Sequence, residues 1–356
     1  MSNHVTRNIQ AVPLVRADLT CDDARAVRRQ MATAPFQDAA LLDRWEAAWE
    51  TLWHRSAVAF AEPTELVQAL KTVMGWQAGD RLGLDPLLDP VWMEAMAAAW
   101  LQPAWRDVHP VSGQGRGDFV GHGPTTGPLR AGLCQYAFGM RAGGERVPGV
   151  PFWLEDLSAR LLPAADCGWG DLQLLYFSGN GMVSAGSSCL LLTRDEALGD
   201  RLRRLRRHPP AALACALGLS QLSSLTQRLA RRQALAERYR HLLRGQAAFQ
   251  LPDDGNGERV WEMFLLTMSS DAGWLGLKTF LHKSHLYADS PLWYKPANLP
   301  PLAGLAQFRA RTLAIPLYAA LTEPEQKHLI NRINRWVARQ EKQRVTGEEQ
   351  PNGESI

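Results

Sequence analysis

Residues 57–108 read AVAFAEPTELVQALKTVMGWQAGDRLGLDPLLDPVWMEAMAAAWLQPAWRDV, and this stretch decides the fold. Three short apolar segments, 57–61, 81–85 and 105–108, are typical of buried strands. The segments between them, 64–74 and 91–100, repeat apolar residues at helical spacing. Strands that alternate with helices in this way predict a parallel sheet with crossover helices, which is an α/β fold.

The same alternation continues on both sides of this stretch. We expect helices at 22–31, 39–54, 198–207 and 211–243, and strands at 151–156, 171–177 and 188–193. Glycine and proline dominate residues 111–149, and we interpret that segment as an irregular loop. The pattern predicts a large α/β domain over residues 18–245, preceded by an N-terminal arm at residues 1–17.

The rest of the chain predicts a smaller unit. After a turn at 253–257, the sequence suggests a strand at 259–268, a helix at 274–282, a short strand and a final helix at 323–339. These elements predict a small C-terminal α+β domain over residues 246–339. The polar residues 340–356 predict a disordered tail.

Length and composition set outer limits on the function. A chain of 356 residues is long enough for about two domains with a substantial core. No apolar run approaches the length of a membrane span and no signal peptide is recognisable, so we expect a cytoplasmic protein without a membrane partner. A net charge of +3 is nearly neutral and argues against a nucleic-acid partner.

The cysteines give no sign of a metal centre. The five cysteines are Cys21, Cys134, Cys167, Cys189 and Cys215, and they are widely scattered. They form no closely spaced pair and no cluster with histidine at metal-ligand spacing. We therefore predict buried free thiols and no metal site.

Four motifs occur along the chain in a consistent order. They are GWQAGD at 75–80, LED at 154–156, ACALGLSQL at 214–222 and LAIPLY at 313–318. With these motifs, roughly residues 18–339 resemble the DegT/StrS-type nucleotide-sugar aminotransferases, pyridoxal-phosphate-dependent enzymes of fold type I. The resemblance implies a large domain with a mostly parallel seven-stranded sheet, a small C-terminal α+β domain and a homodimer.

The resemblance also implies cofactor-binding positions. In such enzymes a carboxylate facing the pyridine nitrogen keeps the cofactor ring protonated, so that the ring can act as an electron sink. Asp156 stands at that position, and Ser178 stands where a hydroxyl could donate to the cofactor's anionic group. The alternative for Asp156 is that it only ends a buried strand and caps the residues after it.

The lysine that should form the Schiff base is missing from its position. The chain has no lysine between Lys71 and Lys278, and alignment with the family pattern places Gly181 at the lysine position, or Asn180 with one residue of slippage. Neither residue can form an imine. An arginine-rich composition could explain few lysines on the surface, but it would not place glycine at this site. The resemblance is therefore to a degenerate member of the family.

The phosphate end of the implied cofactor site is altered as well. Relatives use a serine-glycine-threonine turn at a helix N-terminus to donate hydrogen bonds to the phosphate. The matching stretch here is Ala61-Glu62-Pro63-Thr64, in which proline lacks a backbone donor and glutamate adds a negative charge. A glutamine that often packs near the cofactor ring is replaced by Ala159 or Arg160.

Two main hypotheses for the function follow. The first is a catalytically inactive aminotransferase-fold protein with no cofactor and a binding, regulatory or structural role in polysaccharide or sugar-conjugate biosynthesis. It would act as a homodimer or with an active relative. The alternative is a pyridoxal-phosphate-dependent sugar aminotransferase, or another enzyme that acts on an activated sugar in the inherited cleft. A third hypothesis, a sugar- or nucleotide-binding module, draws on the 13 tryptophans.

One polar-aromatic cluster remains outside these positions. It consists of His282, His285, Tyr287 and Tyr294. The resemblance places this part of the chain at the mouth of the substrate cleft. We therefore expect the cluster to contact a sugar or nucleotide-sugar ligand.

Overall fold

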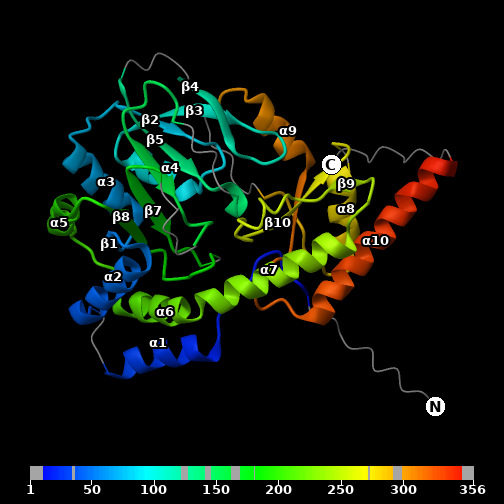
Figure 1. Cartoon of the computed structure of the whole chain (residues 1–356), viewed down its shortest axis with the longest axis horizontal. Coiled ribbons are helices and arrows are strands. Elements are labelled where there is room, and N and C mark those ends of the chain that lie inside the picture. The colour runs from blue at the N-terminus through cyan, green and yellow to red at the C-terminus, as the bar shows by residue number, and fades with distance from the viewer. Residues whose placement is uncertain are drawn as a thin grey trace.

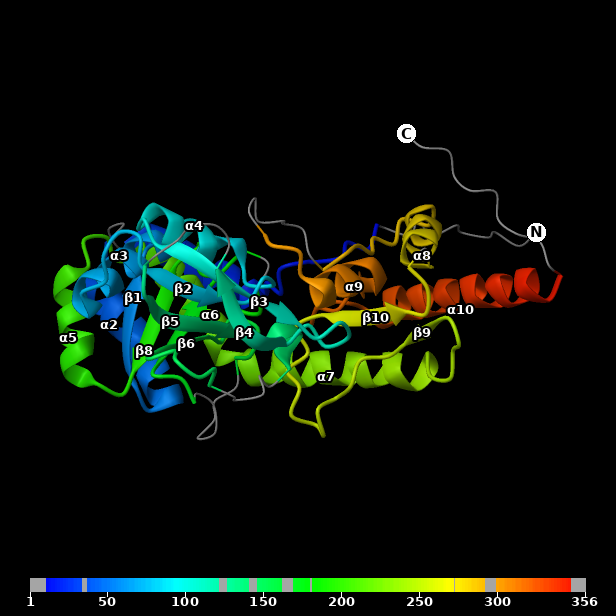
Figure 2. The ribbon, with the colours of Figure 1, turned by 90° about the horizontal axis from the view of Figure 1, so that it is seen from above.

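The computed structural model describes residues 11–33, 37–121, 127–140, 146–161, 169–179, 181–271, 273–291 and 299–346. Within these ranges the chain forms a large sheet with surrounding helices and a small sheet with its own helices. Helix α7 (Leu225–Leu242) runs from one unit to the other (Figures 1 and 2). None of the helices in these ranges is long and apolar enough to cross a membrane.

The large sheet follows the predicted parallel pattern. Its strands are β1 (Ser56–Phe60), β2 (Arg81–Leu84), β3 (Gln102–Val108), β4 (Gly115–Gly121), β5 (Leu129–Gln135), β6 (Trp153–Asp156), β7 (Leu172–Tyr176) and β8 (Cys189–Thr193). They lie in the order β1-β8-β7-β6-β5-β2-β3-β4. The central strands β3, β2, β5, β6 and β7 pair in parallel, whereas β8 and β4 pair antiparallel to their neighbours.

Helices bury both faces of this sheet. They are α2 (Ala39–Trp53), α3 (Pro63–Met74), α4 (Pro90–Ala98), α5 (Glu196–Leu205) and α6 (Ala212–Ser223), and α1 (Cys21–Thr33) packs on α6. Alternate strand residues point to opposite faces. Val58 and Phe60 pack in the core with α3 and α4, whereas Ala57 and Ala59 pack in the core with α2 and α6. Burial on both faces explains why these strands read as continuous apolar runs.

The prediction of an irregular loop at 111–149 is wrong, because this segment contains β4 and β5. Here β4 adds an eighth strand to the seven predicted. The misleading signal was glycine, which in these strands gives room to neighbouring side chains. A Cβ at Gly115 would lie 2.3 Å from Asp85 Oδ1, and one at Gly132 would lie 2.7 Å from the Trp153 ring.

The small unit contains three short strands and three helices among the described residues. The strands are β9 (Phe249–Gln250), β10 (Phe264–Met268) and β11 (Thr312–Ile315), and the helices are α8 (Gly273–His282), α9 (Ala303–Arg311) and α10 (Glu323–Thr346). The prediction of a disordered tail from residue 340 is wrong as far as residue 346, because α10 continues to Thr346. Residues such as Glu341, Lys342 and Gln343 favour helix without needing a buried face. Residues 347–356 lie outside the described ranges.

Two smaller expectations also change. The single helix predicted at 211–243 is divided into α6 and α7 at Ser224, where φ is −108° and ψ is 6°. Four cysteines lie in the described ranges and all are free, but Cys21 is exposed rather than buried.

At the N-terminal arm, Val12 is buried and pairs with Leu286 of the small unit. The arm therefore joins the two units.

Candidate functional site

A cavity of about 220 Å³ lies at the carboxyl ends of the central parallel strands. Polar residues that follow or end four of these strands line it, namely Asp89 after β2, Gln135 in β5, Asp156 in β6 and Ser178 after β7. The carboxyl edge of a parallel sheet is where α/β proteins commonly bind ligands. The position of the cavity thus agrees with a binding site.

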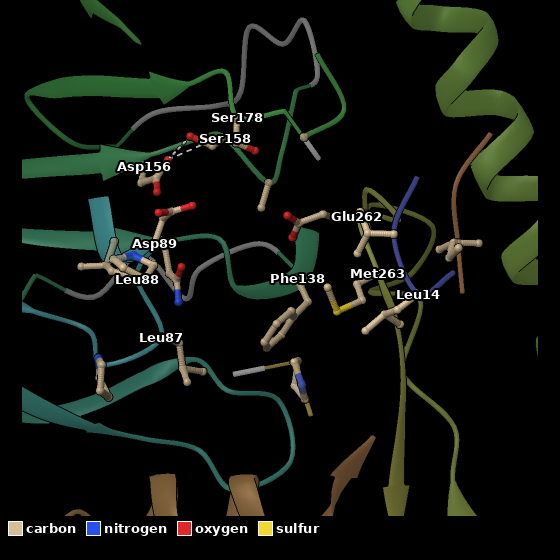
Figure 3. Close-up of a pocket in the computed structure, with 18 of the residues that line it drawn as sticks. Leu14, Leu87, Leu88, Asp89, Phe138, Asp156, Ser158, Ser178, Glu262 and Met263 are labelled. Carbon is tan, nitrogen blue, oxygen red and sulfur yellow. Dashed lines mark hydrogen bonds between the residues drawn. The ribbon is translucent and has the colours of Figure 1, made fainter. Parts of the chain in front are cut away.

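The opposite wall comes from the arm, from α7 and from the small unit. Leu14, Arg232, Glu262, Met263 and Leu317 line this side. In Figure 3, Asp89 and Asp156 lie together on the side of the large sheet, and Glu262 faces them across the cavity. Apolar side chains including Leu87, Leu88 and Phe138 complete the lining. The cavity therefore combines an apolar surface with a few carboxylates.

Asp156 is buried and already has hydrogen-bond donors within the protein. The Trp92 indole Nε1–H donates to its Oδ2 at 2.9 Å, and the backbone N–H of Ser158 donates to Oδ1 at 2.9 Å. The Ser158 hydroxyl also donates to Oδ1. Burial raises the pKa of Asp156 to about 6 because it disfavours the charged form, and the negative charge of Asp89 adds to the rise against these hydrogen bonds.

Two further carboxylates face the cavity. Burial raises the pKa of Asp89, whose Oδ1 accepts the backbone N–H of Val91 at 3.0 Å and caps α4. Burial also raises the pKa of Glu262 to about 7. The charges of Asp156 and Asp89 add to that rise, whereas Arg232 and Arg259 oppose it. Since Asp89 raises the pKa of Asp156, and both raise the pKa of Glu262, the cavity disfavours carrying all three negative charges at once.

Arg232 is the positive residue among the described lining, and its donors are already used. Its Nε and Nη2 donate to Asp18 Oδ2 at 3.1 and 2.7 Å. Its Nη1 donates to the carbonyl oxygens of Trp261, Glu262 and Leu317 at 3.4, 2.9 and 3.1 Å. Arg232 therefore anchors the arm and the small unit to α7, and has little capacity left to bind an anion.

A strained turn shapes the cavity wall at Phe138 and Gly139. Phe138 has φ 53° and ψ 35°, and its ring stacks on Phe308 with centroids 5.6 Å apart. Gly139 has φ 76°, and a Cβ there would lie 1.6 Å from the carbonyl oxygen of Val260. Phe138 is thus a non-glycine residue in the left-handed region. It is held by its stacking on Phe308 and by the close approach of Gly139 to Val260, and such strained residues are common at binding sites.

The structure brings several predicted site residues to the cavity. Asp156, Ser178, Gly181 and Ala159 all line it. Arg160 does not, because its Nη1 donates to the carbonyls of Gly139 and Glu258 at 3.3 and 2.6 Å. Asn180, the second candidate for the lysine position, lies outside the described residues.

No described lysine lines the cavity. Lys71 Nζ donates to the carbonyl of Ala99 at 2.6 Å, and Lys278 pairs with Asp289 at 2.7 Å. A Cβ at Gly181 would lie 3.3 Å from Ser178 Oγ and from the carbonyl oxygen of Val183. The backbone at position 181 could therefore carry a side chain after small adjustments, and this chain has none there.

The altered phosphate turn contacts the loop before α6 instead of facing the cavity. Glu62 precedes Pro63 at the start of α3, and the Ala61 N–H donates to the carbonyl of His208 at 3.0 Å. Glu65 Oε1 accepts the backbone N–H of His208 at 2.9 Å and that of Arg207. These contacts engage the backbone N–H groups of Ala61, Arg207 and His208 within the protein.

The predicted polar-aromatic cluster lies apart from the cavity. His282 Nε2 is 2.8 Å from the carbonyl oxygen of Ala288, and its ring centroid is 5.1 Å from that of Tyr287. Neither residue lines the cavity, and nor does His285, which has φ 56°. Tyr294 lies outside the described residues. Contact of this cluster with a ligand stays a prediction.

Sequence reasoning missed Asp89, Glu262, Phe138 and the indole of Trp92 as site residues. A signal was present for two of them. Asp85-Pro86 and Asp89-Pro90 follow strand β2 at the ligand-binding edge, and Glu262 interrupts the apolar run from Val260 to Leu266. A charged residue within a buried run often faces a site. No local pattern marks Phe138 or Trp92.

The fold and the place of the cavity define the class of protein: this is an α/β fold of the fold type I aminotransferase kind. Residues 165–334 match the model of the DegT/DnrJ/EryC1/StrS aminotransferase family. No protein of curated function matches the sequence significantly.

Solved structures extend the likeness to nearly the whole chain. The aminotransferase TlmJ from Streptoalloteichus hindustanus is 20% identical with a TM-score of 0.81, over 93% of this chain and all of that one. The sugar aminotransferase CalS13 from Micromonospora echinospora is 18% identical with a TM-score of 0.75, over 91% of this chain and 99% of that one. NtdA from Bacillus subtilis, solved with the bound cofactor PMP, is 17% identical with a TM-score of 0.80, over 94% and 86% of the two chains.

The residues present fit pyridoxal phosphate poorly at three points. The resemblance places Gly181 or Asn180 at the lysine position, and Glu62 and Pro63 stand at the implied phosphate turn, where proline offers no backbone donor. Asp156 lines the cavity, but its oxygens already accept hydrogen bonds from Trp92 and Ser158.

Replacing Glu262 with glutamine tests the electrostatics of the cavity. The pKa of about 7 in the folded protein exceeds the ordinary 4.5, so the folded state binds more protons between these values and stability falls as pH rises through them. Glu262→Gln should therefore raise the free energy of unfolding at pH 8 by on the order of 2 kcal/mol and leave it nearly unchanged at pH 4.5. Urea unfolding at both pH values measures this.

Glu341→Gln is the matched control, because Glu341 is exposed on α10. The control should change stability little at either pH. Equal effects of the two substitutions at pH 8 would show that Glu262 carries no unfavourable charge.

Proposed function

We propose that this chain is a non-catalytic member of the aminotransferase family, a binding protein whose ligand occupies the cavity between the two sheets. The single observation that carries the proposal is glycine at position 181, because Schiff-base formation requires an amine. Fold and chemistry can separate in this way, since core packing and site residues are largely independent constraints.

Other features of the same site support the proposal. Arg232 is saturated by Asp18 and three carbonyls, and the turn before α3 carries Glu62 where relatives place phosphate donors. The three cavity carboxylates would repel a phosphate group. A binding role agrees with a cavity that is well formed while its catalytic and anion-binding groups are replaced.

The setting of this role is part of the proposal. TlmJ is described as an aminotransferase and CalS13 as a sugar aminotransferase. By extension, we place this chain in sugar-conjugate or polysaccharide biosynthesis, as a homodimer or paired with a lysine-bearing relative. Size determination of the protein alone and of the mixed pair distinguishes these two assemblies.

Reduction with borohydride in the presence of pyridoxal phosphate tests the proposal. The wild-type protein should show no internal-aldimine absorbance and no saturable adduct on a single lysine, because no described lysine reaches the cavity. Gly181→Lys serves as the matched variant. It should remain inactive in transamination, since the Glu62-Pro63 turn is unchanged.

Two outcomes would refute the proposal. One is a single reducible adduct on wild-type protein that maps to one lysine and saturates. The other is transamination by Gly181→Lys, which would show that the remainder of the cofactor site is intact.

A further inference from the structure

The cavity carries an unbalanced negative charge. Asp89, Asp156 and Glu262 line it, and Arg232 is the one positive side chain among the described lining residues. That guanidinium is already paired with Asp18 at 2.7 Å. Arg259 lowers the pKa of Glu262, but its Nη1 donates to the carbonyl of Asp253 at 3.0 Å and it does not line the cavity. The charge that faces a ligand is therefore negative.

The side chain of Glu262 has free acceptor capacity. Its backbone N–H and carbonyl are bonded to Val260 and Arg232, but its side-chain oxygens accept no hydrogen bond from any described residue. They open onto the cavity and face Asp89 and Asp156 in Figure 3. A half-buried carboxylate that lacks a donor is a group that a ligand can satisfy.

The other residues that line the cavity limit the class of ligand that it can bind. The carboxylates are not arranged as a metal site, since no group of three or more His, Cys, Asp or Glu in the described ranges could hold an ion. The rest of the surface is mainly apolar, with Leu14, Leu87, Phe138 and Met263. A cation with several donors attached to a small organic body fits such a surface, whereas a phosphate does not.

We propose that the cavity binds a small organic amine in its protonated form, with the ammonium hydrogen-bonded to Glu262 and stabilised by the negative charge of Asp89 and Asp156 in the same cavity. An ammonium group carries three donors and no acceptor. It can therefore donate to the side-chain oxygens of Glu262, and its positive charge offsets the negative charge that burial makes costly. The inference rests on the proposed function, because it assigns the ligand class of that same cavity.

Binding should depend on pH in a direction set by the cavity. The groups that face Glu262 are Asp156 and Asp89 from the large sheet, Arg232 from α7 and Arg259 from its own loop. Its raised pKa means that the carboxyl is largely protonated at pH 5 and ionised at pH 8. Affinity for an amine that stays protonated throughout should therefore increase from pH 5 to pH 8.

Ligand-detected NMR and calorimetry on the full chain test this inference. The probes are two matched pairs that differ by an amine in place of a hydroxyl, glucosamine with glucose and cyclohexylamine with cyclohexanol, together with glucose 6-phosphate. In at least one pair the amine should bind about tenfold or more tightly than the alcohol, as expected for a charge-assisted hydrogen bond. The phosphate should bind less tightly than either amine.

Variants locate the binding within the cavity. Glu262→Gln and Asp89→Asn should each weaken amine binding about 10- to 100-fold, and asparagine still caps α4 well, so folding is retained. Glu341→Gln should bind as the wild type does. Equal affinity for amine and alcohol, a preference for the phosphate, or no binding of either amine at millimolar concentration would overturn the inference. None of these outcomes depends on the pyridoxal phosphate test, which decides the proposed function separately.

Discussion

Replacing Arg232 with methionine is expected to lower the free energy of unfolding by about 3–5 kcal/mol, the usual cost of removing one partner of a buried ion pair. Its guanidinium joins Asp18 of the arm to α7 and to three carbonyls of the small unit. Methionine fills much of the same volume but leaves Asp18 buried with a single remaining donor, the backbone N–H of Ala320 at 3.0 Å. Chemical denaturation measures the loss.

Arg244→Met is the matched control for this prediction. Arg244 is exposed just beyond the end of α7. The same chemical change there should alter stability by less than about 0.5 kcal/mol. If both substitutions cost the same, Arg232 is not the anchor between the arm, α7 and the small unit.

Gly139→Ala is expected to destabilise the protein by about 3 kcal/mol or more, because two penalties add. Alanine is disfavoured at φ 76°, and its Cβ would lie 1.6 Å from the carbonyl oxygen of Val260. The backbone of residue 139 or that of Val260 must therefore move. Since Gly139 adjoins Phe138 on the cavity wall, ligand binding should weaken together with stability.

Gly149→Ala separates the two penalties. Gly149 has φ 81°, and a Cβ there would meet nothing within 4 Å. It should cost only the backbone penalty of about 1–2 kcal/mol. A loss at Gly139 no greater than that at Gly149, measured by the same denaturation, would mean that the contact with Val260 relaxes without cost.

The order of the large sheet could be predicted because local patterns reflect burial on both faces. Strands β1, β2, β6, β7 and β8 are short apolar runs between amphipathic helices, and each was expected near its observed place. Strand β5 was not, although it lies in the centre of the sheet between β2 and β6. Its Gly132 accommodates the Trp153 ring, a contact between distant residues that local composition cannot reveal.

The site residues likewise include some that the sequence could predict and some that it could not. Asp156, Ser178 and Gly181 could be placed from motif order, because each follows or ends a recognisable strand. Asp89 and Glu262 come from different units. They line one cavity because the small unit lies against the large sheet, with α7 running between the two units (Figure 2). The saturation of Arg232 is likewise a property of the folded chain, since Asp18 lies far from it in sequence.

The fold holds a cavity at the carboxyl edge of its large sheet, and several polar groups around that cavity are bonded within the protein. The Trp92 indole donates to Asp156, and Glu65 accepts backbone N–H groups of the loop before α6. Three carboxylates remain around an apolar surface. Such a surface selects against phosphates and in favour of cations.

Calorimetric titration of the wild-type protein with pyridoxal phosphate tests this account most directly. It measures occupancy of the cavity by the cofactor whether or not an imine forms. The account predicts no saturable binding in the micromolar range and no competition with an amine ligand. Saturable micromolar binding, lost on replacing Asp156 with alanine, would contradict it and show that the inherited cofactor site still functions.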